Sequence, residues 1–175
     1  PTESGIREFI GNVRFRQGNV TVTCDRAVQN VGLNRADLYG RVVVRQDGVT
    51  ITAPFLSYDG NTHLAVAPKT VIVREGASTI TARRATYSTI THVTTFVDSV
   101  VAVDDSVRLR ADTLVVDRDV DTMLATGRVV VSDPKGTMFM AGDRGTRKPD
   151  RGETRMVGQA RSWQIDTVVG GDTTY

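Results

Sequence analysis

The sequence predicts an all-β protein built from stacked repeats of about 29 residues, and three observations support this prediction. The chain of 175 residues contains 27 Val and 23 Thr, whose branched side chains suit pleated strands better than helices. Apolar and polar residues alternate with period two, as in strands with one buried face. Finally, similar segments recur at a constant spacing, which is the signature of a repeat architecture.

The repeat is clearest around the segment 44–53, which reads VRQDGVTITA. The segments 15–24 and 73–82 read FRQGNVTVTC and VREGASTITA in the same register, and a fourth copy ends at Asp112. A fifth copy runs from Gly127 to Asp143 and contains one inserted residue. The predicted units therefore start at Gly11, Gly40, Lys69, Asp98 and Gly127, with a partial sixth at Gly158.

Each unit is predicted to contain three short strands. In the second unit, a strand at 42–45 is followed by a turn at 46–48 and by a second strand that begins at 49 and continues to 58. A turn at 59–61 then leads into a third strand at 63–67. Gly5 to Ile10 and Trp163 to Ile165 are expected to add one strand at each end of the stack.

The long segment 77–126 lacks Gly and Pro, so it is the one place where a helix is a competing interpretation. The repeat register continues through it, and Asp-rich turns are predicted at 104–106 and 117–119. We therefore predict no helix. The polar stretch 143–155 is predicted to be a loop between the fifth and sixth units, and residues 1–175 are predicted to form a single domain.

Stacking the units places their inward apolar residues in one continuous wall. Two interpretations remain open: the wall is an ordinary filled core, or it lines a trough with room for a guest. The second is favoured by few aromatic residues and by small residues at one repeated position, namely Cys24, Ala53, Ala82 and Ala111. The predicted wall residues, which become the lipid-binding residues if the trough is open, are Val13, Phe15, Val20, Val22, Val42, Val44, Val49, Ile51, Val71, Val73, Ile80, Leu109, Leu114, Val129 and Val131, with Met138 and Met140 as further candidates.

Composition and motifs argue against several functional classes. The net charge is only +2 and the basic residues are scattered, which is unlike a nucleic-acid-binding surface. Cys24 is the only cysteine, so neither a disulfide nor a zinc site of cysteines is expected. No apolar run is long enough to cross a bilayer. The sequence begins at Pro1, so we expect a processed chain whose targeting segment is absent.

No catalytic or metal-binding constellation is predicted. His63 and His92 are 29 residues apart, so the repeat itself explains their alignment better than a metal pair does. Asp104 and Asp105 are adjacent, as in a turn, and do not form the facing carboxylate pair of a glycosidase. The segment that starts at Asp117 resembles the beginning of a calcium-binding loop, but it lacks the Gly and the Glu that such a loop requires. We expect no enzymatic activity and no cofactor.

The repeated elements resemble the OstA-like family of lipopolysaccharide-transport proteins. The resemblance rests on a Gly-Asn-Val or Gly-Arg-Val-Val-Val opening, as at 11–13 and 127–131, on a Gly-containing turn, and on a following strand that ends in Cys-Asp or Ala-Asp, as at 22–25 and 109–112, with a further match at 53–59. It extends from Gly11 to about Gly158. Pro54 and Arg83 depart from the pattern, because they stand where the family favours Asp.

The resemblance implies a twisted, open β-jellyroll and a non-enzymatic role in moving lipopolysaccharide to the outer membrane. The family includes the periplasmic bridge component, its membrane-anchored partner and the amino-terminal domain of the outer-membrane translocon. It implies lipopolysaccharide or lipid A as a ligand, like domains or a second copy as edge-strand partners, and a periplasmic location. Arg83 and Arg84 are candidates to meet lipid phosphates at the trough mouth, unless they are solvated outer-face residues. The alternative function is a structural or adhesive β-solenoid that binds polysaccharide or protein on its outer face.

Overall fold

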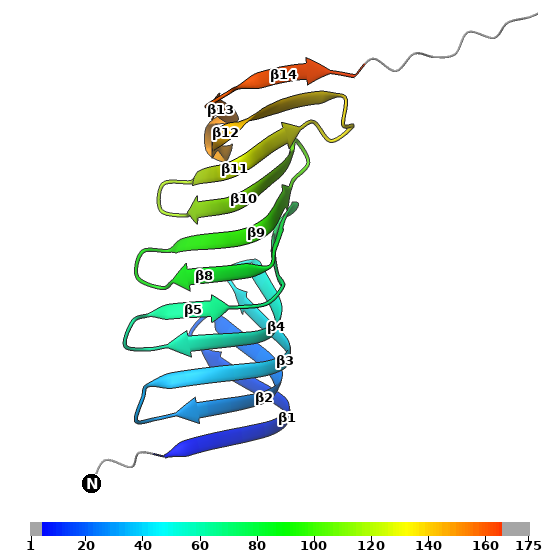
Figure 1. The fold of residues 1–175 in the computed structure, drawn as a ribbon. Helices are drawn as coiled ribbons and strands as arrows, with labels where there is room; N and C mark the ends of the chain where they lie inside the picture. Colours follow the sequence, from blue (N-terminus) through cyan, green and yellow to red (C-terminus); the bar gives the residue numbers. More distant parts are fainter. Residues whose placement is uncertain (1–4, 166–175) are drawn as a thin grey trace, which may run out of the picture.

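The computed structural model describes residues 5–165 and places 14 strands in one antiparallel sheet that is folded over on itself (Figure 1). Strands follow one another up the stack, so each pairs mainly with its neighbours in sequence. The strands are β1 (Ile6–Gln17), β2 (Val20–Asn30), β3 (Arg35–Gln46), β4 (Val49–Asp59), β5 (Leu64–Ala67), β6 (Val71–Glu75), β7 (Ser78–Ala82), β8 (Arg84–Ser88), β9 (Val93–Val103), β10 (Arg108–Asp117), β11 (Thr122–Ser132), β12 (Met138–Lys148), β13 (Glu153–Val157) and β14 (Arg161–Gln164). None of the helical structure in this range has the length and apolarity of a membrane span.

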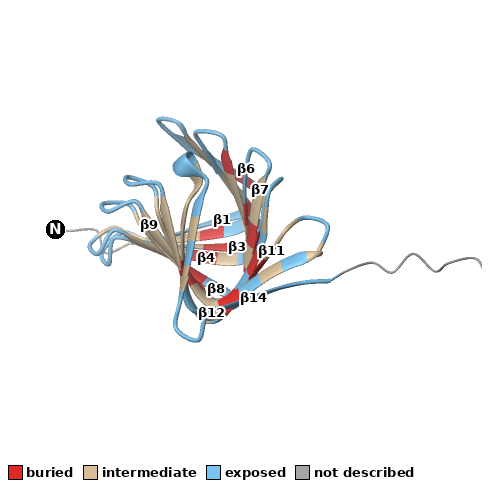
Figure 2. Cartoon of the chain, turned by 90° about the horizontal axis from the view of Figure 1, so that it is seen from above, coloured by how far each residue is buried: buried red, intermediate tan, exposed pale blue. Residues whose placement is uncertain are grey.

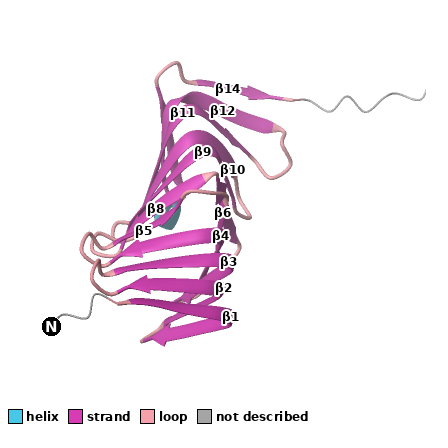
Figure 3. Cartoon of the chain, turned by 60° about the horizontal axis from the view of Figure 1, so that its bottom comes forward, coloured by secondary structure: helices cyan, strands magenta, loops and turns pink. Residues whose placement is uncertain are grey.

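Each long strand bends near its middle, so the sheet forms two arms that meet at a corner (Figures 2 and 3). Arm 1 ends at the turns that join β1 to β2, β3 to β4, β6 to β7, β9 to β10 and β11 to β12. Arm 2 ends at the alternate turns, which join β2 to β3, β4 to β5, β8 to β9, β10 to β11 and β12 to β13. The arms face each other, and the space between them widens from the corner towards the turns.

A bulge at the start of the first, second, fourth and fifth repeats produces the bend. In β3, Gly40 and Arg41 both have positive φ, and the register between β2 and β3 shifts across them. A Cβ on Gly40 would collide with the carboxylate of Asp25, so glycine is required here for space as well as for φ. Gly127 is in the same situation against Asp112. The contact between the Gly and the Asp of the repeat therefore accompanies the bulge that bends the sheet.

The corner differs in the middle of the stack, where the sequence departs from the repeat. Pro54 and Lys69 replace the Asp and Gly of the third unit, and the strand that should cross the corner is broken between β5 and β6. A second break separates β7 from β8 at Arg83. Prolines have no backbone N–H to donate, so the ladder cannot continue through Pro54 and Pro68.

The core is densest at the corner and continues along arm 2. The third position of every unit is a buried Val: Val13, Val42, Val71, Val100 and Val129. A second buried row runs up arm 2 and alternates between pairs of large and pairs of small residues. In the order of the stack, its members are Ala27, Leu38, Leu56, Ala67, Ala85, Phe96, Leu114, Ala125 and Gly145, followed by the half-buried Met156.

The all-β repeat architecture and the Asp turns at 104–106 and 117–119 are confirmed. Three details of the prediction are wrong. The third strand of one unit and the first strand of the next are usually a single strand that runs through the bulge, such as β3 (Arg35–Gln46), whereas the second strand at 49–58 is confirmed by β4. The fifth copy contains two extra residues, since Val131 pairs with Met140, nine positions on, where Val44 pairs with Ile51, seven positions on.

The third error concerns the polar stretch 143–155, which is not a loop. β12 extends through it to Lys148, and β13 begins at Glu153. Only a 3₁₀ turn at Pro149–Arg151 separates them, and it is the only helical element within residues 5–165. Polar composition misled the prediction because polar side chains stand on both faces of β12, with the inward Arg147 held in an ion pair, while the backbone still pairs.

Candidate functional site

The candidate site is the trough, which we define as the inward-facing side of the two arms from the corner to the turns (Figure 2). Ten of the fifteen predicted wall residues are buried. They are Val13, Val42, Val49, Val71, Val73, Ile80, Leu109, Leu114, Val129 and Val131.

The other five wall residues are accessible, and all of them lie in β1 to β4. Phe15 is 37% exposed, and Val20, Val22, Val44 and Ile51 are half-buried. Later units have buried residues at the matching positions; for example, Ile80 and Leu109 follow Val22 and Ile51 in the repeat. The trough is therefore open over its first four strands and packed beyond them. Met138 and Met140, the further candidates, are exposed near the opposite end of the stack.

The small residues do not create the opening. Cys24, Ala53, Ala82 and Ala111 are all buried at the corner. There the Val from the third position of a unit on a neighbouring strand, such as Val42 beside Ala53, fills the space. Burial raises the pKa of the Cys24 thiol, so this side chain is a neutral part of the core. The room for a guest comes instead from the accessible side chains nearer the turns.

Two ion pairs join the arms over the packed half of the trough. Arg118, at a turn of arm 2, contacts Glu75 at the end of β6 in arm 1, with 3.0 Å between Nη2 and Oε2. Arg147 of β12 contacts Asp104 at the tip of β9, with 2.8 Å between Nη2 and Oδ2. Both pairs are 43 residues apart in sequence, and the second follows the first by one repeat.

The open half lacks the residues for such pairs. Gln17 and Gln46 occupy the positions of Glu75 and Asp104, while Gly60 and Thr89 occupy the matching positions of Arg118 in the earlier units. The cross-arm ion pairs are thus a feature that our sequence reading missed. The signal was present as an acid and an arginine that recur together at a constant separation.

Asp104 is held as a carboxylate by its surroundings. Burial raises its pKa, but hydrogen bonds from Ser106 and from the Val107 N–H, together with the Arg147 guanidinium, outweigh burial and lower the pKa below its ordinary value. The side chain of Arg147 is only 11% exposed. This pair therefore places two opposite charges at the edge of the core, where Arg147 Nη2 is hydrogen-bonded and its buried Nε has no partner among the described residues.

Arg83 and Arg84 do not lie at the trough mouth, which corrects that candidate assignment. They lie at the corner, where a hollow of about 470 Å³ is lined by Pro54, Pro68, Lys69, Thr70, Arg83, Arg84 and Asp98. Arg84 is paired with Asp98, with 2.5 Å between Nη2 and Oδ2. Both arginines are exposed, as the outer-face alternative predicts.

The two histidines occupy equivalent turns at the end of arm 2, and both have positive φ. His92 Nδ1 lies 2.8 Å from Asp119 Oδ1 in the next turn of the stack. Within residues 5–165, no group of three or more His, Cys, Asp or Glu side chains is arranged to hold a metal ion.

The stack ends in edge strands that carry exposed apolar residues. Among residues 5–165, β1 pairs with β2 alone, and Ile6 and Ile10 on it are 70% and 75% exposed. Phe9 meets Phe15 edge to face at the entrance of the trough, with 5.6 Å between ring centroids. At the other end, β14 pairs with β12 and exposes Trp163.

Comparison with known proteins places the chain in a family. No curated protein matches it. Among solved structures it is similar to LptH from Pseudomonas aeruginosa, described as the LptA homologous periplasmic component of the conserved lipopolysaccharide transport device, with 12% identity, 85% of this chain and 94% of that chain covered, and a TM-score of 0.34. The family described as OstA-like protein matches residues 2–139, which include the four regular repeats and the open trough. This chain therefore belongs to the OstA-like family.

Proposed function

We propose that this protein is a non-enzymatic scaffold of lipopolysaccharide transport, which shields acyl chains in the open half of the trough and joins end to end with like domains. Residues 1–175 would act as a single domain in the periplasm, since one sheet connects all the described strands. Membership in the OstA-like family supports the general role.

The observation that carries the proposal is the accessible apolar wall formed by β1 to β4. Phe15, Val44 and Ile51 face inward yet remain partly open to solvent, where the same positions in later units are buried. Moving an acyl chain of a dozen carbons from water into such a wall is worth on the order of 10 kcal/mol, at ~0.8 kcal/mol per methylene. Apolar burial alone would hold the lipid, without any catalytic group.

The two halves of the trough differ, and this difference restricts where lipid would bind. The cross-arm ion pairs Glu75–Arg118 and Asp104–Arg147 bridge the arms only over the packed half. We therefore place the acyl chains beside β1 to β4, with their path continuing past Phe9 and Phe15 at the open end.

Photo-crosslinking tests this placement. A photoreactive residue at Val44 or Ile51 should label bound lipid A, whereas the same residue at Thr50 or Thr52, one position away on the outward face of β4, should not. Leu109, a buried wall residue in the packed half, should label weakly. Labelling confined to Thr50 and Thr52, or equal at all sites, would refute a lipid-binding trough.

End-to-end joining has a separate test. The unpaired edge of β1 with exposed Ile6 and Ile10 offers a strand to which a like domain could add. The double substitution Ile6→Lys and Ile10→Lys should reduce concentration-dependent association measured by sedimentation velocity. Leu33→Lys, at an exposed turn, is the matched control and should leave association unchanged. Association that survives the β1 change would refute joining through this edge.

A further inference from the structure

The outward face of arm 1 carries a regular ladder of arginine and threonine. Arg45 of β3 lies opposite Thr21 of β2 on one side and opposite Thr50 of β4 on the other. Arg74 of β6 lies between Thr50 and Thr79 in the same way. Arg16 begins the row opposite Thr21. Arginine and threonine therefore alternate strand by strand from β1 to β7, after which Val103 of β9 lies between Thr79 and Arg108 of β10.

Three further arginines extend this ladder. Arg14 of β1 and Arg108 and Arg110 of β10 point outward from the same arm, since their neighbours Val13 and Leu109 point into the core. We call the six residues Arg14, Arg16, Arg45, Arg74, Arg108 and Arg110 the arginine ladder. All six are exposed.

None of the ion pairs among the described residues involves a ladder arginine. The acids of arm 1 on this side lie at its ends, with Asp47 and Asp105 in the tip turns, and with Asp25 and Asp112 at the corner, where they pair with Arg41 and Arg128. The outward face of arm 2 is different, because Arg26 there pairs with Glu8 and Arg35 pairs with Asp37. A chain with a net charge of only +2 thus concentrates unpaired positive charge on one face.

The spacing of the ladder suits a linear ligand. Arg16, Arg45 and Arg74 are separated by two strand spacings each, or roughly 10 Å, which is about one Debye length at physiological salt, and Arg108 follows Arg74 after three strand spacings. The arginines therefore repel one another little. A flexible chain with regularly spaced negative groups would contact several of them at once and gain from multivalency.

We propose that the arginine ladder binds a linear anionic polysaccharide, with the guanidinium groups on its carboxylate or phosphate groups and the intervening Thr hydroxyls on its sugar hydroxyls. Guanidinium forks match both anions, and Thr offers a donor and an acceptor between each pair of arginines. A membrane surface fits less well. The outward residues Val43, Ile72 and Val101 of arm 1 are half-buried, and the more exposed Val103, at 38%, is a single short side chain that offers little for insertion into lipid.

The experiment measures binding of the whole chain to polygalacturonate, with neutral dextran as the uncharged polymer and vesicles containing phosphatidylglycerol as the membrane. We expect binding to polygalacturonate that weakens as salt is raised, and none to dextran. Arg45→Gln with Arg74→Gln should weaken binding about tenfold, because two adjacent charged contacts are lost. Arg16→Gln with Arg108→Gln gives a second, independent measurement at the ends of the ladder.

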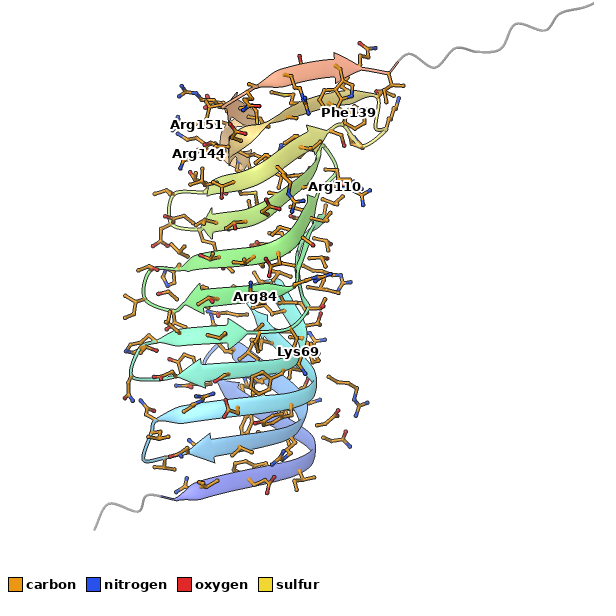
Figure 4. The ribbon with its side chains drawn as sticks, in the orientation of Figure 1. Lys69, Arg84, Arg110, Phe139, Arg144 and Arg151 are labelled. Atoms are coloured by element: carbon orange, nitrogen blue, oxygen red, sulfur yellow. The ribbon has the colours of Figure 1, made fainter. Side chains whose placement is uncertain are left out.

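The matched control is Arg144→Gln with Arg155→Gln. These exposed arginines lie on arm 2 in β12 and β13, so the control changes net charge by the same amount; Arg110 and Arg144 lie on opposite sides of the stack (Figure 4). It should leave binding unchanged. If the ladder and control variants weaken binding equally, the effect depends only on net charge, and the proposal is overturned. Absence of binding, or tighter binding to the vesicles, would overturn it too.

Discussion

Arg147 reaches from β12 in arm 2 to Asp104 at the tip of β9 in arm 1, and its Nη2 also lies 3.0 Å from Ser106 Oγ. The Asp104 carboxylate accepts from Arg147 on Oδ2 and from Ser106 and Val107 on Oδ1. One carboxylate thus closes a turn with one oxygen and ties the two arms together with the other.

Removing this tie should cost stability. Arg147→Gln leaves Asp104 without its cation, and we expect a loss of about 1–3 kcal/mol in the free energy of unfolding, as for a partly buried charged hydrogen bond. Urea unfolding followed by circular dichroism measures it. Arg110→Gln is the control, since that side chain is exposed and should change stability by less than about 0.5 kcal/mol. Equal effects of the two changes would show that the pair does not hold the arms.

The buried row of arm 2 makes a second prediction. Leu114 is fully buried, so Leu114→Ala should destabilise the protein by about 2–5 kcal/mol through lost burial and a cavity. The same chemical change at Leu33, a turn residue that is 61% exposed, should cost less than about 0.5 kcal/mol. Thermal unfolding compares the two, and a small effect at Leu114 would contradict the packing described for this row.

The close contact between Gly40 and Asp25 at the corner predicts that two glycines with positive φ will differ in the stability lost on substitution by alanine. A methyl group at Gly40 meets the Asp25 carboxylate, whereas at Gly48, in a tip turn, it meets nothing within 4 Å. Both Gly→Ala changes strain φ by about 1 kcal/mol, and only Gly40→Ala should cost clearly more. Chemical unfolding of the two variants measures the difference. Equal losses would show that Asp25 moves aside freely.

Stability should fall in acid. The Arg41 guanidinium hydrogen-bonded to Asp25 lowers the pKa of that carboxyl, and Arg128 does the same for Asp112. A group whose pKa is lower in the folded state stabilises the fold above its unfolded value of about 4, and this contribution is lost as the pH falls through that value and the folded one.

The measurement is the urea midpoint between pH 7 and pH 2.5. The double variant Asp25→Asn and Asp112→Asn should show a shallower decline in acid than the original chain. Some decline should remain, because Asp59, Asp104 and Asp133 also have lowered pKa values. Parallel curves for the two proteins would contradict the assignment.

The repeat made much of the fold predictable, because equivalent residues of successive units form equivalent strands and are buried at equivalent places. Val13, Val42 and Val71 share one position in the sequence and one buried place at the corner. The bend was not predicted, since it depends on a three-residue relation among Gly40, Arg41 and Asp25 that joins neighbouring strands. The alternation of apolar and polar residues alone predicted which side chains face inward, but it did not predict how deeply each of them is buried.

Coverage of the trough depends on contacts between residues 43 positions apart, which period-two patterns do not report. The wall residues Val44 and Val73 look equivalent in the sequence, yet only Val73 is buried. The two residues belong to different core clusters, Val73 to the larger one and Val44 to the edge of the smaller one. In the same way, Arg83 and Arg84 were assigned to the mouth because the sequence does not reveal which side of a bent strand forms the corner.

The buried row of arm 2 has a consequence for how such a protein can lengthen over evolution. Its sizes change from one unit to the next, with Ala27 and Leu38 followed by Leu56 and Ala67, then Ala85 and Phe96. The backbone thus repeats after one unit, but the packing repeats only after two. Duplicating or deleting a single unit would bring unmatched volumes together, whereas a duplication of two units would insert without repacking its neighbours.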